Sequence, residues 1–176
     1  MKLRHAAIAA ALLASAALVG CEKKAAAPAA VDKAKIAEAV KADANAMIAA
    51  FNARDAEKAV SHDAPGMIGM FHGTPNVVGA EEDMKMTKQQ FAENAVANVK
   101  LSNETVDVAD SGDMAIYRAS YAFSGEDPKT KKAINETGNW VVGYQKQADG
   151  AWKIAWNVVS DAPAAAPGAT AAPAKK

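Results

Sequence analysis

Two histidines, His62 and His72, are the side chains of this sequence that best suit proton transfer near neutral pH. The stretch from Met67 to His72 is apolar and lies among glycines and prolines, which favours a short strand between turns. A histidine at the end of such a strand can act as a general acid or base where it faces a pocket. It can also be a polar residue that faces solvent. We take His72 as the candidate catalytic residue and keep both interpretations open.

His62 and Asp63 form an adjacent pair that would suit a base and the carboxylate that orients it. Adjacent residues on one element point apart, so the simpler interpretation of His62 is a histidine at a helix C-terminus. Together with His72 the pair matches no established metal-ligand spacing such as HExxH. The sequence also lacks the phosphate-binding and nucleotide-binding glycine motifs and the GxSxG motif of hydrolases. We therefore expect no metal and no cofactor.

A group of tyrosines and tryptophans in the second half of the chain supplies the candidate ligand-binding residues. These side chains bring a polar tip to an apolar wall, which is the composition of many small-molecule pockets. Each of them suits a protein core as well, and the sequence leaves that alternative open. The candidates are Tyr117, Tyr121, Trp140, Tyr144 and Trp156.

The charges of the chain are balanced, with 20 basic and 20 acidic residues and a formal net charge of +0. A nucleic-acid-binding protein normally carries a basic patch and an excess of positive charge. We therefore expect no nucleic-acid partner. The length of 176 residues favours a single domain.

The N-terminus has the pattern of an export signal. Lys2 and Arg4 precede a run of apolar and small residues, Ala6 to Val19, that is too short to span a bilayer as a mature helix. The run leads into Leu-Val-Gly-Cys, and Cys21 is the only cysteine of the chain. This stretch resembles a bacterial lipobox, in which the cysteine becomes the lipidated first residue of the mature protein. An ordinary signal peptide with a chance cysteine is the alternative.

The lipobox implies a periplasmic domain anchored to a membrane through Cys21. Glu22 follows the cysteine where inner-membrane lipoproteins carry aspartate, which favours the outer membrane. The Ala- and Pro-rich ends show no periodic spacing of apolar residues and carry no large side chains that could form a core. The expected organisation is a signal peptide at 1–20, a tether at 21–31, one folded domain at 32–161 and a disordered tail at 162–176.

The folded domain begins with a helical pattern. Asp32 is a good N-cap, and Asn52 can end the helix that follows it. Asp55 can cap a short second helix from Ala56 to Ser61, and a third helix is expected from Ala80. The first helix carries one apolar stripe, formed by Ile36, Val40, Ala44, Met47 and Phe51.

After the third helix the apolar period changes to two, which predicts antiparallel strands joined by hairpins. Helices that are followed by a run of strands are typical of an α+β fold, and we expect three helices and five or six strands. The expected strands are Lys100–Asp110, Met114–Ser124, Ala133–Gln147 and Trp152–Ser160.

The last hairpin allows two registers, set by the length of the loop around Asp149 and Gly150. A one-residue shift moves every side chain to the other face of the sheet. We prefer a three-residue loop with Gly150 in the left-handed conformation, because it separates apolar from polar residues better. In this register Trp140, Val142 and Tyr144 share a face with Trp152, Ile154, Trp156 and Val158.

The order of these elements resembles the nuclear transport factor two-like superfamily, and more narrowly its SnoaL-like and ketosteroid-isomerase-like bacterial domains. The resemblance covers residues 33–161 and rests on the stretch "MIAAFNARDAEKAVSHDA" and on the closing hairpin "DGAWKIAWNVVSD". It implies a cone-shaped, curved antiparallel sheet wrapped around the three N-terminal helices, with an apolar pocket at one end. It also implies a homodimer formed through the sheet.

In the ketosteroid isomerases that this chain resembles, the catalytic base is a carboxylate at the end of the first strand. His72 falls at or near that position, whereas Asp63 corresponds to a carboxylate that precedes the strand. This departure speaks against steroid-type isomerisation. An aromatic pocket wall without convergent charged residues favours a non-catalytic domain that binds a small apolar ligand or a partner. The alternatives are a small isomerase, dehydratase or hydrolase that uses His72 as its acid or base, and a purely structural dimerisation module.

Overall fold

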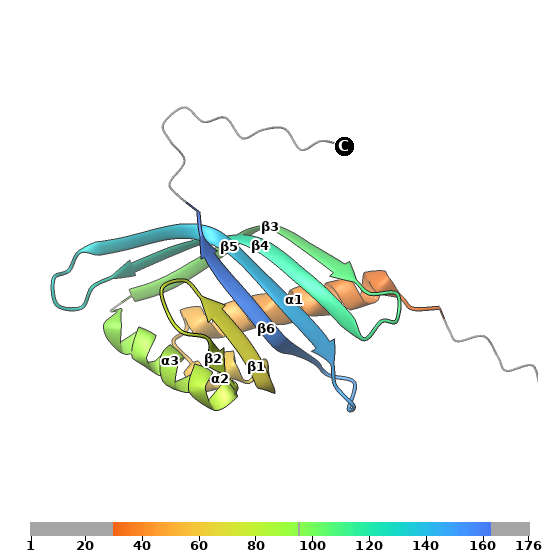
Figure 1. Cartoon of the computed structure of the whole chain (residues 1–176). Helices are drawn as coiled ribbons and strands as arrows, with labels where there is room; N and C mark the ends of the chain where they lie inside the picture. The colour runs from red at the N-terminus through yellow and green to blue at the C-terminus, as the bar shows by residue number, and fades with distance from the viewer. Residues whose placement is uncertain (1–29, 95, 163–176) are drawn as a thin grey trace, which may run out of the picture. The chain divides into compact units, whose positions relative to one another are not determined.

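A computed structural model describes residues 30–94 and 96–162, which form three helices and one six-stranded sheet (Figure 1). Helices come first along the chain and long strands follow, so the predicted α+β order is confirmed. The predicted signal peptide, Cys21 and almost all of both Ala/Pro-rich ends lie outside the described residues. The elements are α1 (Lys33–Asn52), α2 (Ala56–Val60), β1 (Asp63–Phe71), β2 (Val77–Val78), α3 (Ala80–Glu93), β3 (Val96–Val108), β4 (Met114–Glu126), β5 (Ala133–Lys146) and β6 (Trp152–Asp161).

The helices begin where their capping residues predict. The side chain of Asp32 accepts a hydrogen bond from the backbone N–H of Lys35 at 3.0 Å. Asp55 accepts the equivalent bond from Lys58 at 2.9 Å. No helix of the described residues combines the length and the apolar character needed to cross a membrane.

The sheet has the strand order β2-β1-β6-β5-β4-β3 and is antiparallel except where β1 runs parallel to β6. That parallel pair is a departure from the expected all-antiparallel sheet. The long helix α1 packs along the concave face, while α2 and α3 lie together near β1 (Figure 1). Alternate residues of β4 point inward and are buried against α1, which is where the core lies. The inward residues of β4 are Ala115, Tyr117, Ala119, Tyr121 and Phe123.

The last hairpin starts in the preferred register and then leaves it. Tyr144 pairs with Ile154, as predicted, but the next pair joins Gly143 to Trp156, so Ala155 is an extra residue in β6. This β-bulge turns every later side chain of the strand to the opposite face. The prediction that Trp156 shares a face with Trp140 is therefore wrong.

The bulge places the Trp156 indole on the outer face, directly over Gly143. A Cβ atom at Gly143 would lie 2.0 Å from Cε2 of the indole, so the ring occupies the place of the missing side chain. Two residues are carried inward instead. Asn157 is paired with Val142, and Val159 with Trp140.

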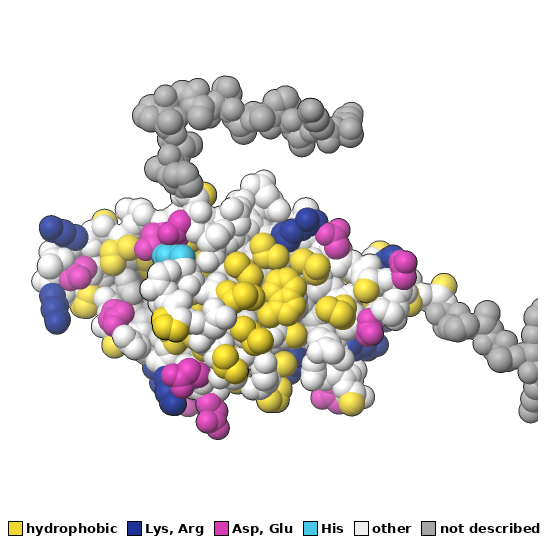
Figure 2. Space-filling view, viewed as in Figure 1, with side chains coloured by type: hydrophobic (Ala, Val, Ile, Leu, Met, Phe, Trp, Pro, Cys, Tyr) yellow, Lys and Arg dark blue, Asp and Glu magenta, His cyan; other side chains and the backbone are white. Residues whose placement is uncertain are grey.

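The outer face carries a continuous row of paired residues across the sheet. The row runs from Val78 through Ile68, Trp156 and Gly143 to Ile116. Ile68 is 41% exposed and Val78 is 66% exposed, which is high for large apolar side chains. Figure 2 shows hydrophobic side chains gathered at the centre of this face. We refer to these five residues as the outer row.

Candidate functional site

A pocket of about 690 Å³ opens between the three helices and the concave face of the sheet. Its walls are mainly apolar and come from α1, β3, β4, β5 and β6. The apolar lining includes Met47, Phe51, Val99, Leu101, Phe123 and Trp140. Polar side chains line the same space as well, and we call three of them, Asp63, Asp83 and Asn157, the pocket floor.

The pocket floor is assembled from three elements that are distant in the sequence. Asp63 is the first residue of β1, Asp83 lies in the first turn of α3, and Asn157 follows the bulge of β6. The start of α3 is fixed to β1, because Gly79 at the N-cap donates its backbone N–H to the Met67 carbonyl at 2.8 Å. Gly79 has a φ of 89°, a conformation that glycine adopts without strain. This contact holds Asp83 over β1.

Asp63 and Asp83 share a proton. Burial raises the pKa of Asp63 to about 8, and the negative charge of Asp83 and a hydrogen bond to it add to the rise, while Lys153 opposes it. Burial also raises the pKa of Asp83, and the hydrogen bond from Asp63 acts in the opposite direction. At neutral pH Asp63 is therefore mainly protonated, and a hydrogen bond joins its carboxyl group to that of Asp83.

Several polar atoms on the pocket wall have no hydrogen-bond partner among the described residues. They are Oδ2 of Asp63, Oδ1 of Asn157 and the hydroxyl of Tyr121. Asn157 is only 6% exposed and Tyr121 only 8%. A buried polar atom without a partner costs free energy, and such atoms are normally paired with protein, water or a ligand. These three atoms can receive hydrogen bonds from a molecule in the pocket.

A second group of polar residues lies farther along α1 and is paired internally. The Tyr117 hydroxyl donates to Oε2 of Glu104 at 3.0 Å, and the Asn45 amide donates to the same oxygen at 2.8 Å. Burial, and then Glu104, raises the pKa of Tyr117 well above its usual range. We call Asn45, Glu104 and Tyr117 the inner network. None of the three lines the pocket.

A histidine–aspartate pair lies between these two groups. Nδ1 of His62 is 2.8 Å from Oδ1 of Asp43. The Tyr144 hydroxyl lies close to this carboxylate, and burial, followed by the charge of Asp43, raises its pKa above the usual range. His62 thus has an orienting carboxylate, but it is Asp43 on α1 and not the adjacent Asp63.

The structure divides the predicted aromatic residues among three places. Tyr121 and Trp140 line the pocket. Tyr117 and Tyr144 are fully buried in the core outside the pocket lining. Trp156 lies on the outer face because of the bulge. Two of the five candidates therefore line the pocket, and the other three take the alternative roles of core or outer-face residues.

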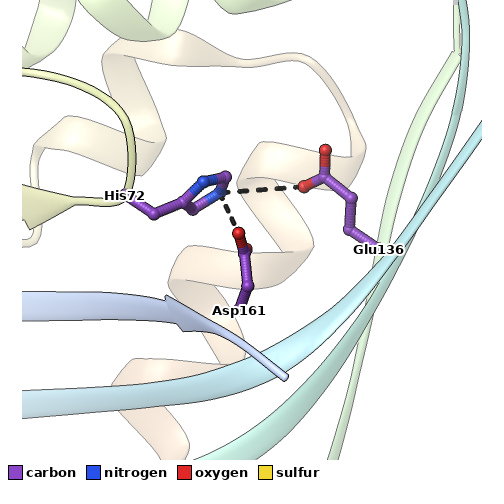
Figure 3. A group of neighbouring side chains, drawn as sticks. All are labelled: His72, Glu136 and Asp161. Carbon is purple, nitrogen blue, oxygen red and sulfur yellow. Dashed lines mark ion pairs between the residues drawn. The ribbon is translucent and has the colours of Figure 1, made fainter. Parts of the chain in front are cut away.

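His72 lies at the mouth of the pocket and not on its floor. It follows the last residue of β1, and its side chain is 42% exposed. Its Nε2 atom is 3.1 Å from Oδ1 of Asp161 and 3.9 Å from Oε2 of Glu136 (Figure 3). We call His72, Glu136 and Asp161 the rim cluster.

Sequence reasoning missed Asp83 and Asn157 as site residues. Asp83 follows Glu81 and Glu82, and acidic residues are common in the first turn of any helix. One available signal was its spacing, since Asp83, Thr87 and Phe91 form the buried stripe of α3 at intervals of one turn. Asn157 had no such signal, because only the bulge turns it inward.

The chain resembles known proteins in sequence pattern and in fold. A model of the SnoaL-like domain matches residues 40–165. No curated protein matches the chain. A ketosteroid isomerase-like protein from Erwinia carotovora atroseptica is 21% identical over 72% of this chain and 96% of its own, with a TM-score of 0.63.

Two further solved structures have the same fold. A protein provisionally named a dehydratase of the NTF2-like family, from Streptomyces avermitilis, is 18% identical over 72% of this chain and 96% of its own, with a TM-score of 0.64. A nuclear transport factor 2-like superfamily protein from Salmonella enterica is 12% identical over 78% of this chain and 99% of its own, with a TM-score of 0.67. At these identities the likeness concerns the fold alone.

Proposed function

The chain belongs to the SnoaL-like domain family, and from this premise we propose that its pocket binds a small, mainly apolar molecule that carries a hydroxyl or carbonyl oxygen. The observation that carries the proposal is the pocket floor. Unpartnered polar atoms of Asp63 and Asn157 line a cavity whose walls are mainly apolar. Binding without catalysis is the favoured form of the proposal.

The size and chemistry of the pocket support this class of ligand. Its volume of about 690 Å³ lies within the range of small-molecule sites, which is roughly 300–1,000 Å³. The apolar walls favour ring systems or short chains. The protonated Asp63 can donate to a carbonyl oxygen, and an oxygen of Asp83 can accept from a hydroxyl group.

The test compares two probes that differ by one oxygen. Naphthalene and 1-naphthol present the same apolar rings, and only 1-naphthol can hydrogen-bond to the pocket floor. We expect the wild type to prefer 1-naphthol by roughly tenfold, the value of one or two hydrogen bonds. The preference should disappear in Asp83→Ala and persist in Glu104→Gln, a matched change in the inner network. Equal binding of the two probes by the wild type, or no binding of either, would contradict the proposal.

Acid–base catalysis is the second candidate function, and the shared proton of Asp63 and Asp83 favours it. Carboxyl groups with strongly raised pKa values in a cleft are frequent catalytic groups. One member of the pair holds a proton and the other can accept one, which is what an isomerase or dehydratase needs. The neighbours from Erwinia and Streptomyces carry names of this kind. His72 could serve only a group that stays at the mouth.

Proton exchange at carbon distinguishes the two acid–base assignments. The protons beside the carbonyl of α-tetralone can be followed by NMR in deuterated water. Catalysis by the aspartate pair predicts exchange that Asp63→Asn lowers by about 10²–10⁴-fold, while His72→Ala leaves it unchanged. Loss of exchange in His72→Ala alone would assign the chemistry to the histidine. Absence of exchange in the wild type would leave binding as the function of this pocket.

We further propose that Cys21 is lipidated and anchors the domain in the periplasm, at the outer membrane. The support is the lipobox-like sequence and the Glu22 that follows it. Labelling cells with a radioactive fatty acid tests the anchor, with Cys21→Ser as the control. We expect label on the wild type alone, and label retained by the Ser variant would refute the claim.

The outer row supports a homodimer through the sheet, either alongside ligand binding or as a structural role in its own right. Exposed apolar side chains in one continuous row are typical of an interface. Sedimentation velocity should find a dimer for the wild type and a monomer for Ile68→Lys with Ile116→Lys. Ser124→Lys, on the same face but outside the row, should remain dimeric. A monomeric wild type would contradict this proposal.

A further inference from the structure

The rim cluster brings together one imidazole and two carboxylates from three separate parts of the chain. His72 follows the end of β1, Glu136 lies on β5 and Asp161 is the last residue of β6. The ligand atoms of the three side chains all lie within 4.8 Å of one another. Figure 3 shows that Nε2 of the imidazole faces both carboxylates. No sequence motif marks this cluster, because its members are far apart along the chain.

From this geometry we propose that His72, Glu136 and Asp161 bind a divalent transition metal, for which zinc is the best fit. Zinc accepts imidazole nitrogen and carboxylate oxygen at about 2.0–2.2 Å, so tetrahedral ligand atoms lie roughly 3.3 Å apart. The separations of 3.1 Å and 3.9 Å from Nε2 of His72 are close to that value. Glu136 is 44% exposed and can move the remaining distance without disturbing the core.

The charges of the rim cluster also suit a cation. Two carboxylates face a single imidazole, so the cluster is negative whether or not the histidine is protonated. A divalent ion balances both carboxylates, and a neutral imidazole is then free to donate its lone pair. Magnesium and calcium prefer oxygen ligands, so the histidine favours zinc and its neighbours in the transition series.

A buried tyrosine lies beside the cluster. Tyr121 is 8% exposed, and its hydroxyl lies near the carboxylates of Asp161 and Glu136. It is placed to hydrogen-bond a water molecule on the metal.

A glycine makes this placement possible. Gly138 pairs with Tyr121 on one side and with Asp161 on the other. A Cβ atom at Gly138 would lie 2.7 Å from Cε1 of Tyr121 and 2.0 Å from the Ser160 carbonyl oxygen. The tyrosine ring therefore lies across the bare backbone of β5, toward the rim cluster.

The proposed metal would stand at the mouth of the pocket with coordination positions to spare. Three protein ligands leave room for water or for an oxygen of a bound molecule, which is the pattern of open zinc sites. This inference does not depend on the proposed function, because the pocket floor and the rim cluster share no residue.

Zinc binding can be measured by isothermal titration calorimetry on the purified protein. The parent protein in this experiment is Cys21→Ser, and all variants carry the same change, because a free thiol could bind zinc by itself. We expect one zinc ion per chain with micromolar or tighter affinity. His72→Ala and Asp161→Asn should each weaken binding by at least about tenfold. Glu126→Gln, an exposed carboxylate of β4 paired with Lys131, is the matched control and should bind zinc like the parent.

Cobalt provides a second readout that reports on coordination. The parent protein with Co²⁺ should show the visible absorption of a low-symmetry site, and the His72→Ala variant should lose it. Circular dichroism confirms that the variants are folded, which is expected because all three side chains are exposed. Zinc affinity that is unchanged in both rim variants, or that is absent in the parent at micromolar concentrations, would overturn the proposal. Loss of 1-naphthol binding in Asp83→Ala with zinc binding retained would separate the pocket from the metal site.

Discussion

The inner network and the pocket floor differ in how their polar groups are satisfied. In the inner network each polar group finds a protein partner, since Glu104 receives hydrogen bonds from Tyr117 and from Asn45. On the pocket floor the pKa of Asp63 is raised by burial and by the neighbouring Asp83, and Asn157 has an oxygen without a partner among the described residues. The first arrangement stabilises the fold, while the second lowers stability and leaves polar atoms available for a ligand.

Local backbone geometry explains the difference. The β3 strand has a bulge between Ser102 and Thr105, and Asn103 there has a φ of 55°. This bulge turns Glu104 inward, where α1 lies close enough to supply Asn45. At the pocket end α3 faces the sheet across an open cavity, so Asp83 meets Asp63 and little else.

The largest expected effect is the loss of an aromatic ring from the inner network. Tyr117 is fully buried and lies edge-on to Trp140 with ring centroids 5.4 Å apart. Tyr117→Ala should lower the free energy of unfolding by about 3–5 kcal/mol, because it leaves a cavity and frees Glu104 from its donor. Urea denaturation measures the loss. A loss below about 1 kcal/mol would show that the inner network does not support the fold.

A pH-dependent effect is expected from the pocket floor. The pKa of Asp63 is raised to about 8 in the folded state and lies near 3.9 in the unfolded chain, so between these values the folded state binds the additional proton. Its contribution to stability is present below about pH 4 and is lost as the pH rises through about 8. Wild type should therefore lose stability, relative to Asp63→Asn, by about 1–4 kcal/mol from pH 5 to pH 9.

Urea denaturation of the two proteins at several pH values tests this point. Parallel stability curves for wild type and Asp63→Asn would mean that Asp63 ionises normally. The comparison isolates the aspartate pair, because all other titrating groups are common to both proteins. Asp83→Asn should also reduce the loss of stability between pH 5 and pH 9, because the two carboxyl groups titrate as one unit.

A smaller effect is expected when the charge alone is removed from the inner network. Glu104→Gln keeps an oxygen for Tyr117 but makes the acceptor neutral. The free energy of unfolding should fall by about 1 kcal/mol. Asp83→Asn, the equivalent change on the pocket floor, should leave stability at pH 9 unchanged or raise it. Equal losses from both changes would remove the distinction between the two regions.

The smallest effect is expected at the rim. Asp161→Asn breaks an exposed ion pair with His72, and exposed pairs contribute about 0–1 kcal/mol. The metal-free variant should therefore unfold at nearly the same urea concentration as the wild type. A large loss of stability would indicate that the rim cluster serves to stabilise the sheet and not to bind a ligand.

The sequence was a good guide to local structure and a poor guide to the site. The helix starts at Asp32 and Asp55 and the antiparallel hairpins depend on neighbouring residues, so period and capping were enough to predict them. The parallel pairing of β1 with β6 joins residues far apart in the chain and leaves no local signal. The aspartate pair and the rim cluster depend on the same pairing. His72 was predicted as a site residue from its residue type, but its partners Glu136 and Asp161 were not predicted.

The extra residue in β6 has a consequence for how such a domain can change over time. Ala155 decides whether an indole or an amide side chain enters the cavity, because it sets the direction of Trp156 and Asn157 together. Loss of a single codon at this point would send the indole inward and fill the cavity, and would also take the central aromatic ring from the outer row. One small mutational event would thus alter the pocket and the outer row together, because Trp156 and Asn157 would change places.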